Sequence, residues 1–232
     1  MAGAGDARAG AGPTGAGSVS TLSEADSKAL VARFGVPVPD ERVVGDAAGA
    51  RLAADAIGYP VVVKLCGASI AHKTERGLVR LGVSGPDDVE AAALELLEAA
   101  RPEDGEVGVL VAPMHAGRRE LIAGLHRDPQ FGMTVMLGVG GVLAEAVQDV
   151  TFRLVPIERV DAHEMIDDLR AQPLLGAFRG EPPVDRERVA DVLLALSHVA
   201  EGDMSVVSVD LNPLILVDGV PIAVDALVEV ER

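Results

Sequence analysis

A short valine-rich run near residue 60 constrains the fold of this chain more than any other feature. The segment YPVVVKLCG, residues 59–67, is apolar at every position from Val61 to Cys66 except Lys64. An apolar run of this length, bounded by proline and glycine, is typical of a buried strand. A lysine within it requires a compensating anion, because a buried ammonium group is costly unless it is paired. The alternative is a lysine at the strand end whose ammonium group reaches solvent.

The composition restricts both the core and the partners of the chain. Aromatic residues make up 2% of the 232 residues, so the core must be built mainly from Val, Leu, Ala and Ile. The formal net charge of −16 argues against nucleic acid and against an anionic membrane surface as partners. The single cysteine, Cys66, excludes a disulfide framework, and we interpret it as a core residue. Without a visible signal peptide or membrane-spanning run, we expect a cytoplasmic protein.

Alternating strand-like and helical segments indicate an α/β protein with two lobes. Residues 1–21 are rich in Gly and Ala and lack periodicity, which predicts a disordered tail. The first helix is expected to begin after Ser23, a typical N-cap residue, and to end at Gly35. We expect an N-terminal lobe over residues 22–110 and a C-terminal lobe over residues 111–232.

A basic turn follows the valine-rich strand. The segment AHKTERG places His72 and Lys73 side by side ahead of Gly77 and a second strand. Only three of the 20 basic residues are lysines, so a lysine at this turn is informative. Backbone N–H groups and a basic side chain can together hold an anion, although the spacing is not that of a P-loop. The alternative for His72 is an ordinary histidine in a turn.

Three oxygen-bearing side chains near the C-terminus form a candidate metal site. Asp210 and Asn212 share one face of a predicted strand, because side chains alternate along a strand. Asp225 is expected on the partner strand of a hairpin that turns at Asp218-Gly219, directed to the same face. Carboxylate and amide oxygens are suitable ligands for Mg²⁺. The alternative is the solvated polar face of an antiparallel sheet.

In this order along two α/β lobes, these clusters resemble an ATP-grasp domain. The resemblance is greatest to the nucleotide-binding β subunit, or fused β domain, of the NDP-forming acyl-CoA synthetases, which include ADP-forming acetyl-CoA synthetases and relatives of succinyl-CoA synthetase. It extends from about residue 22 through the segments LSEADSKALVARFGVPVP, YPVVVKL, HKTERGLVRLGV, RRELIAGLHRDPQFG, LGVGGVLAEAVQDVTFRLVPI, PLLGAFRGEPP and VDLNPLILVDGVPIAVDA. It implies an ATP-grasp fold with the nucleotide site between the two lobes.

The resemblance also implies roles for individual residues. Lys64 is expected to hold the nucleotide phosphates, and Arg153 to offset phosphate charge. His72 is expected to carry a phosphoryl group between an α-subunit phosphohistidine and ADP, a task that suits an imidazole near neutral pH. The implied nucleotide-binding residues are Lys64, Lys73, Gly77, Val111, Ala112, Met114, His115 and Glu120. The implied Mg²⁺ ligands are Asp210, Asn212 and Asp225.

The implied partner is a separate CoA-binding α subunit, in an α₂β₂ heterotetramer that uses ATP or ADP as substrate. Three positions depart from the family pattern. Leu78 replaces the second glycine of a pair and is expected to crowd the approach to phosphate. Ala112-Pro113 replaces a hinge that usually carries Gln-Glu or a single Glu, and Ser208 replaces a common glutamate.

These departures keep two other hypotheses open. The first is a non-catalytic regulatory or scaffolding relative whose nucleotide site is weakened. The second is a different ATP-grasp ligase that forms a free acyl phosphate and has no need of His72.

Overall fold

The computed structural model describes residues 18–70, 73–141 and 148–231. One part of it is a four-stranded antiparallel sheet, referred to below as the small sheet. Its strands are, in order, β2 (Arg42–Val44), β5 (Gly108–Pro113), β3 (Val61–Cys66) and β4 (Val79–Val83). Its helical elements are α2 (Ala47–Ile57), α3 (Pro86–Glu98) and the 3-10 helix η1 (Pro102–Asp104).

Strand β3 is buried along its whole length, as the valine-rich run predicts. Val61, Val63 and Leu65 belong to the core that the small sheet shares with α2 and α3. Because side chains alternate along a strand, Lys64 and Cys66 face the opposite side of the sheet. Lys64 is therefore directed away from α2 and α3 and toward the rest of the molecule.

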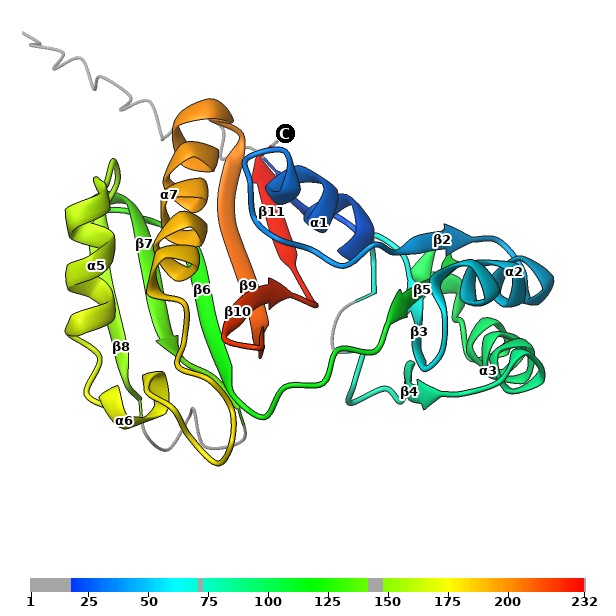
Figure 1. Cartoon of the computed structure of the whole chain (residues 1–232). Coiled ribbons are helices and arrows are strands. Elements are labelled where there is room, and N and C mark those ends of the chain that lie inside the picture. The colour runs from blue at the N-terminus through cyan, green and yellow to red at the C-terminus, as the bar shows by residue number, and fades with distance from the viewer. Residues whose placement is uncertain (1–17, 71–72, 142–147, 232) are drawn as a thin grey trace, which may run out of the picture.

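The second part is a seven-stranded antiparallel sheet, referred to below as the large sheet. Its strands are, in order, β1 (Val19–Thr21), β11 (Leu227–Glu231), β9 (Val206–Val217), β6 (Glu120–Asp128), β7 (Gly132–Val139) and β8 (Val150–Leu154), with β10 (Val220–Ala223) also paired to β9. The helices of this part are α1 (Glu24–Ala32), α5 (Arg159–Asp167), α6 (Gln172–Leu175) and α7 (Arg186–Gly202). Figure 1 shows the large sheet with α5 and α7 at the left, the small sheet with α2 and α3 at the right, and α1 between them.

The main hydrophobic core lies between the large sheet and α5 and α7. Val209 and Leu211 of β9 belong to this core. Asp210 and Asn212 alternate with them and are exposed, so they face the side of the sheet away from α7. Among the described residues, no helix has both the length and the apolar character needed to cross a membrane.

The structure confirms an α/β protein with two sheets but differs from the expected division at three places. Val19–Thr21 form β1 rather than part of a tail, and pair with β11. Helix α1 packs on β11 and α7, so the chain begins on the large sheet before entering the small one. Strand β5 continues to Pro113, and the chain crosses to the large sheet at residues 114–119 rather than near residue 110. The exact lobe limits stay a prediction.

Candidate functional site

Two adjoining cavities are lined by the large sheet on one side, and on the other by the small sheet or the segment between its strands β3 and β4. The first, of about 370 Å³, is referred to below as the acidic cavity. It is lined by apolar residues and by seven polar or charged ones, which are Glu24, Lys73, Thr74, Glu75, Asp210, Asn212 and Asp225. The second, of about 440 Å³, is lined by β3, β4, β9 and the 114–119 connection, and is referred to below as the hinge cavity. Thr74 and Asp225 line both cavities. The two cavities therefore meet at these residues.

All three lysines of the chain converge on one carboxylate where the cavities meet. The Nζ atoms of Lys28 and Lys64 each donate to Glu24 Oε1 at 2.7 Å, and Lys73 Nζ donates to Glu24 Oε2. Glu24 is the first residue of α1, where Ser23 accepts a hydrogen bond from the Asp26 N–H as the N-cap. The anion that the buried lysine of β3 requires is therefore supplied by α1.

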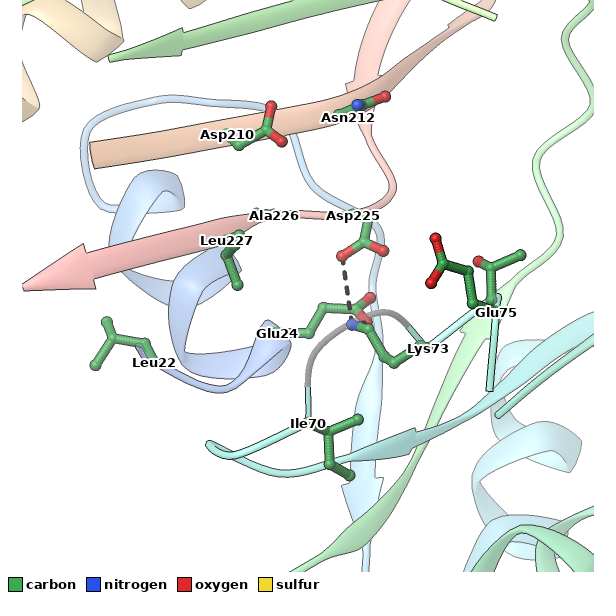
Figure 2. A pocket seen from close by; sticks show the side chains of 11 residues that line it. Leu22, Glu24, Ile70, Lys73, Glu75, Asp210, Asn212, Asp225, Ala226 and Leu227 are labelled. Atoms are coloured by element: carbon green, nitrogen blue, oxygen red, sulfur yellow. Dashed lines mark hydrogen bonds and ion pairs between the residues drawn. The ribbon is translucent and has the colours of Figure 1, made fainter. Parts of the chain in front are cut away.

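Asp225 is the second acceptor in this cluster. Its carboxylate lies 3.5 Å from Lys73 Nζ and 3.8 Å from Lys64 Nζ. Figure 2 shows Lys73 directed toward Asp225, with Glu24 beside it and the side chains of Asp210 and Asn212 on the neighbouring strand. Lys64 also donates to the carbonyl oxygen of Val224 at 3.1 Å. Both lysines are thus held at the junction of the two cavities.

Burial and charge act in opposite directions on this cluster. Burial raises the pKa of Glu24, but the ammonium groups of Lys64, Lys28 and Lys73 outweigh it and lower the pKa to about 2. Burial lowers the pKa of Lys73, but the carboxylates of Glu24 and Asp225 outweigh it and raise the pKa. Glu24 and Lys73 are therefore both charged at neutral pH.

The three predicted metal ligands line the same cavity. Asp210 and Asn212 share the exposed face of β9, as the alternation predicts. Asp225 was expected on a strand, but it lies in the three-residue break between β10 and β11. The break faces Pro213, which has no N–H to donate to a neighbouring strand.

The donor set of this site is two carboxylates and one amide oxygen. No group of three or more His, Cys, Asp or Glu side chains within the described residues is placed to hold a metal ion. Desolvation in the cavity and the neighbouring Asp225 carboxylate raise the pKa of Asp210. A divalent cation between Asp210 and Asp225 would relieve this repulsion, and oxygen donors of this kind suit Mg²⁺. The residues therefore fit a magnesium ion that keeps several waters.

The hinge cavity combines apolar walls with a few polar groups. Of the predicted nucleotide-binding residues, Ala112, Met114, His115 and Glu120 line it together with Lys64. Its other apolar lining residues include Val62, Val79, Leu81 and Ile215. Burial lowers the pKa of His115, so the imidazole is neutral at pH 7. The cavity suits a flat, largely apolar group with polar edges.

Two other predicted nucleotide-binding residues do not line either cavity. Val111 is fully buried in the core between the small sheet and its helices. Gly77 has a φ of +68° and its N–H donates to the Thr74 carbonyl oxygen at 3.1 Å, which closes the turn after Lys73. Gly77 therefore shapes the backbone of this turn and does not itself line either cavity.

The turn that carries Lys73 is fixed at its C-terminal end. Arg76 forms a two-pronged ion pair with Asp104 at 2.8 Å, and together with the Arg101 N–H it lowers the pKa of Asp104 to about 2. Leu78 was expected to crowd the phosphate approach. Its side chain instead packs in the core of the small sheet and is 1% exposed. The substitution of glycine by leucine at this position therefore leaves the cavities open.

Of the three predicted catalytic residues, Lys64 lies at the junction of the cavities. His72 lies outside the described residues. Arg153 was expected to offset phosphate charge, but it lies on β8 at the far edge of the large sheet. Its guanidinium pairs with Asp168 at 2.8 Å and Glu164 at 3.5 Å, at the C-terminal end of α5. These ion pairs link α5 to β8, and Arg153 lines neither cavity.

The sequence analysis missed Glu24 as a member of the site. Its only local signal is the spacing of four residues to Lys28 on the same helix. Its contacts with Lys64 and Lys73 join segments 40 and 49 residues apart. A stronger indication was the apolar run around Lys64, since a buried ammonium group requires a nearby anion.

Comparisons with known proteins agree with this geometry. The family model described as "ATP-grasp domain" matches residues 16–230. The β subunit of acetate–CoA ligase [ADP-forming] II from Pyrococcus furiosus is 39% identical over 197 residues, which cover 83% of this chain and 84% of that subunit. The chain belongs to the ATP-grasp β subunits of the ADP-forming acetate–CoA ligases. With it the predicted family and fold are confirmed.

Relatives of this β-subunit family also occur as longer chains. Acetate–CoA ligase [ADP-forming] I from Archaeoglobus fulgidus is 40% identical over 193 residues, which cover 82% of this chain and 28% of that one. Among solved structures, dinucleotide-forming acetyl-coenzyme A synthetase 1 from Candidatus Korarchaeum cryptofilum, in complex with coenzyme A, Ca-AMPCP and HgCl⁺, superposes with a TM-score of 0.85 and 34% identity, covering 92% of this chain and 94% of that one. Another structure of that synthetase contains Mg-AMPPCP and has its phosphohistidine segment pointing towards the nucleotide binding site.

Proposed function

We propose that this β subunit binds ADP or ATP with Mg²⁺ in the two cavities and exchanges a phosphoryl group with a CoA-binding α subunit. The observation that carries the proposal is the junction of the cavities. There Lys64 and Lys73 lie within 3.8 and 3.5 Å of Asp225, which shares the acidic cavity with Asp210 and Asn212. Phosphoryl transfer depends chiefly on positioning and on neutralising charge, and these residues provide both.

Each part of the site has a proposed role. The apolar hinge cavity takes the adenine, with neutral His115 and the Ala112–Met114 backbone at its edge and Glu120 near the ribose. Lys64 and Lys73 hold the phosphates. Asp210, Asn212 and Asp225 hold Mg²⁺, which offsets the charge of the phosphates when it is bound.

His72 is proposed as the phosphoryl carrier, on the strength of the sequence resemblance. In the first step the P–N bond of the α-subunit phosphohistidine breaks while a P–N bond to His72 forms, and the imidazole proton of His72 passes to the α-subunit imidazole. In the second step a terminal phosphate oxygen of ADP attacks the phosphorus. The P–N bond to His72 then breaks, a P–O bond forms, and the imidazole takes up one proton.

The α partner is needed for the complete acid–CoA ligase reaction. β-Subunit relatives that match most of this chain are named as subunits, and the Archaeoglobus relative carries the matching region in a longer chain. We propose that the α subunit binds CoA and recognises the acyl acid, in an α₂β₂ assembly. The cytoplasmic location stays a prediction.

Calorimetric titration with ADP and ATP, with and without Mg²⁺, tests the nucleotide site. We expect metal-dependent binding of micromolar strength by the chain or by its complex with the α subunit. An absence of binding in both preparations would favour the non-catalytic regulatory relative instead.

A His72→Asn variant tests the relay. We expect transfer between the α-subunit phosphohistidine and ADP to fall at least 100-fold, with ADP affinity within a few fold of wild type, because asparagine cannot carry the phosphoryl group. Transfer at the wild-type rate would mean that the α-subunit segment delivers the group directly. Loss of ADP binding would give His72 a structural role.

A further inference from the structure

We propose that Glu24 is a positioning residue for this reaction, whose carboxylate fixes the ammonium groups of Lys64 and Lys73 where the nucleotide phosphates bind. The inference rests on the proposed function, because it gives those two lysines their task. The side chain of Glu24 is 1% exposed, so the carboxylate acts through the lysines and not by touching the nucleotide. Helix α1 thereby becomes part of the phosphate site.

The contacts of the lysines support this role. Lys64 comes from β3 of the small sheet and Lys73 from the turn that follows, whereas Glu24 belongs to a helix packed on the large sheet. An ammonium group has three N–H donors. Lys64 uses two of them, on Glu24 at 2.7 Å and on the Val224 carbonyl oxygen at 3.1 Å. One donor of a well-oriented ammonium group is left to meet a phosphate.

Glu24 matters more than Asp225 for holding Lys64 and Lys73 in place, because Asp225 is also a candidate metal ligand. Asp225 also faces both lysines, at 3.5 and 3.8 Å. If Asp225 binds Mg²⁺ together with Asp210 and Asn212, its charge is shared with the metal and its hold on the lysines weakens. Glu24 is then the carboxylate that keeps Lys64 and Lys73 in place while metal and nucleotide are bound.

The variant Glu24→Gln separates positioning from simple attraction, because the two effects have opposite signs. Removal of a negative charge beside the phosphate site raises ADP affinity if Coulomb attraction alone matters. Loss of the anchor lowers ADP affinity, because Lys64 and Lys73 are no longer held in place. We expect calorimetry to give at least tenfold weaker binding of Mg-ADP. Adenosine, which has no phosphates, should bind within twofold of wild type, whereas a general loss of structure would weaken both ligands.

A matched control and a second variant complete the test. Glu41→Gln removes the same charge from the same cluster, but Glu41 forms its ion pair with Lys28 and is hydrogen-bonded to neither Lys64 nor Lys73. We expect its ADP affinity to stay within twofold of wild type. Glu24→Asp keeps the charge, which favours folding, but its side chain is one methylene group shorter and places the carboxylate farther from the lysines. We expect it to weaken ADP about three- to tenfold and to leave adenosine unchanged.

Wild-type or higher ADP affinity in both Glu24 variants would overturn the inference, and so would equal losses for ADP and adenosine. If wild type binds no nucleotide even with its α subunit, the proposed function fails separately. Whether Glu24 holds the two ammonium groups is then decided on the unliganded chain with ¹³Cε-labelled lysine, which gives one resonance for each of the three lysines. Glu24→Gln should shift the Lys64 and Lys73 resonances at constant pH, whereas Glu41→Gln should shift chiefly that of Lys28, because Glu41 is paired with Lys28 and acts on Lys64 only through space. Unmoved Lys64 and Lys73 resonances would contradict the inference.

Discussion

At the scale of single residues, Glu24 shows how burial and ion pairs compete at one carboxylate. Burial raises its pKa, yet three ammonium groups bring the pKa down to about 2 from the usual 4.5. A group whose pKa is depressed by folding stabilises the folded state above its unfolded pKa. That stabilisation is lost as the pH falls from about 4.5 toward about 2. Its size follows from the shift and is on the order of 3 kcal/mol.

The acid stability of wild type and Glu24→Gln should therefore differ in a pH-dependent way. We expect the variant to be less stable by a nearly constant amount above about pH 5, with the difference shrinking toward pH 2. Urea unfolding at a series of pH values measures both free energies. A difference that stays constant down to pH 2 would mean that the carboxylate is not the titrating group.

The residue-level chemistry was only partly predictable. The apolar surroundings of Lys64 implied a buried anion, because the desolvation cost depends on local sequence. The identity of that anion depends on how α1 packs beside β3, which no periodic pattern encodes. The same limit applies to Arg153, whose acidic partners on α5 follow it by 11 and 15 residues but were not predicted to face it.

At the scale of elements, β3 and β4 divide their side chains between a core and a cavity. Leu78 immediately precedes β4 and packs on the core side. We expect Leu78→Ala to lower the free energy of unfolding by about 2–5 kcal/mol, because it leaves a cavity in a close-packed core. ADP affinity should not change. A change in ADP affinity with unaltered stability would place the side chain at the phosphate approach instead.

Arg153, unlike Leu78, lies on an edge strand, β8 of the large sheet. Its ion pairs with Asp168 and Glu164 are partly exposed, and exposed pairs contribute little. We expect Arg153→Ala to change the free energy of unfolding by less than about 1 kcal/mol. Calorimetry should give a wild-type ADP affinity, whereas Lys64→Met should weaken ADP at least tenfold. A comparable loss in both variants would restore Arg153 to the phosphate site.

The strands other than β1 were largely predictable, since an apolar run or an alternating pattern marks most of them. The break at Val224–Ala226 was not predicted, although its cause is visible in the sequence. Pro213 of β9 cannot donate a hydrogen bond at the point where β10 stops pairing. The break directs the Asp225 side chain toward Lys64 and Lys73. This orientation was not expected for a residue within a continuous strand.

At the scale of the whole molecule, both sheets contribute walls to the cavities, so a nucleotide binds the folded protein and not the unfolded chain. Ligand at 100 times its Kd then adds about 2.7 kcal/mol to the free energy of unfolding. For a protein of this size we expect Mg-ADP to raise the Tm by roughly 5–11 °C. Thermal unfolding followed by fluorescence of an external dye measures this shift. No shift at saturating ADP would contradict a site shared by the two sheets.

The overall fold was predictable because the segments of the family occur in order along almost the whole chain. The attachment of β1 and α1 to the large sheet was not, since chain order suggests that neighbouring segments share a lobe. Pairing between residues 19–21 and 229–231 joins segments that are far apart in the sequence, and local patterns carry no information about such contacts.

The concentration of every lysine in one cluster affects how a nucleotide arrives. The chain has a formal net charge of −16, and the lysines are matched nearby by Glu24, Glu41 and Asp225. At long range, the net negative charge of the protein therefore repels a polyanion such as ADP. The lysines attract ADP only when it is close to the cavities. Raising the ionic strength from about 0.01 to 0.15 M shortens the screening length from about 30 to 8 Å. We expect the higher ionic strength to increase the rate of ADP association with the isolated chain in stopped-flow measurements. Salt usually slows the binding of a charged ligand to its site, so the expected effect has the opposite sign here.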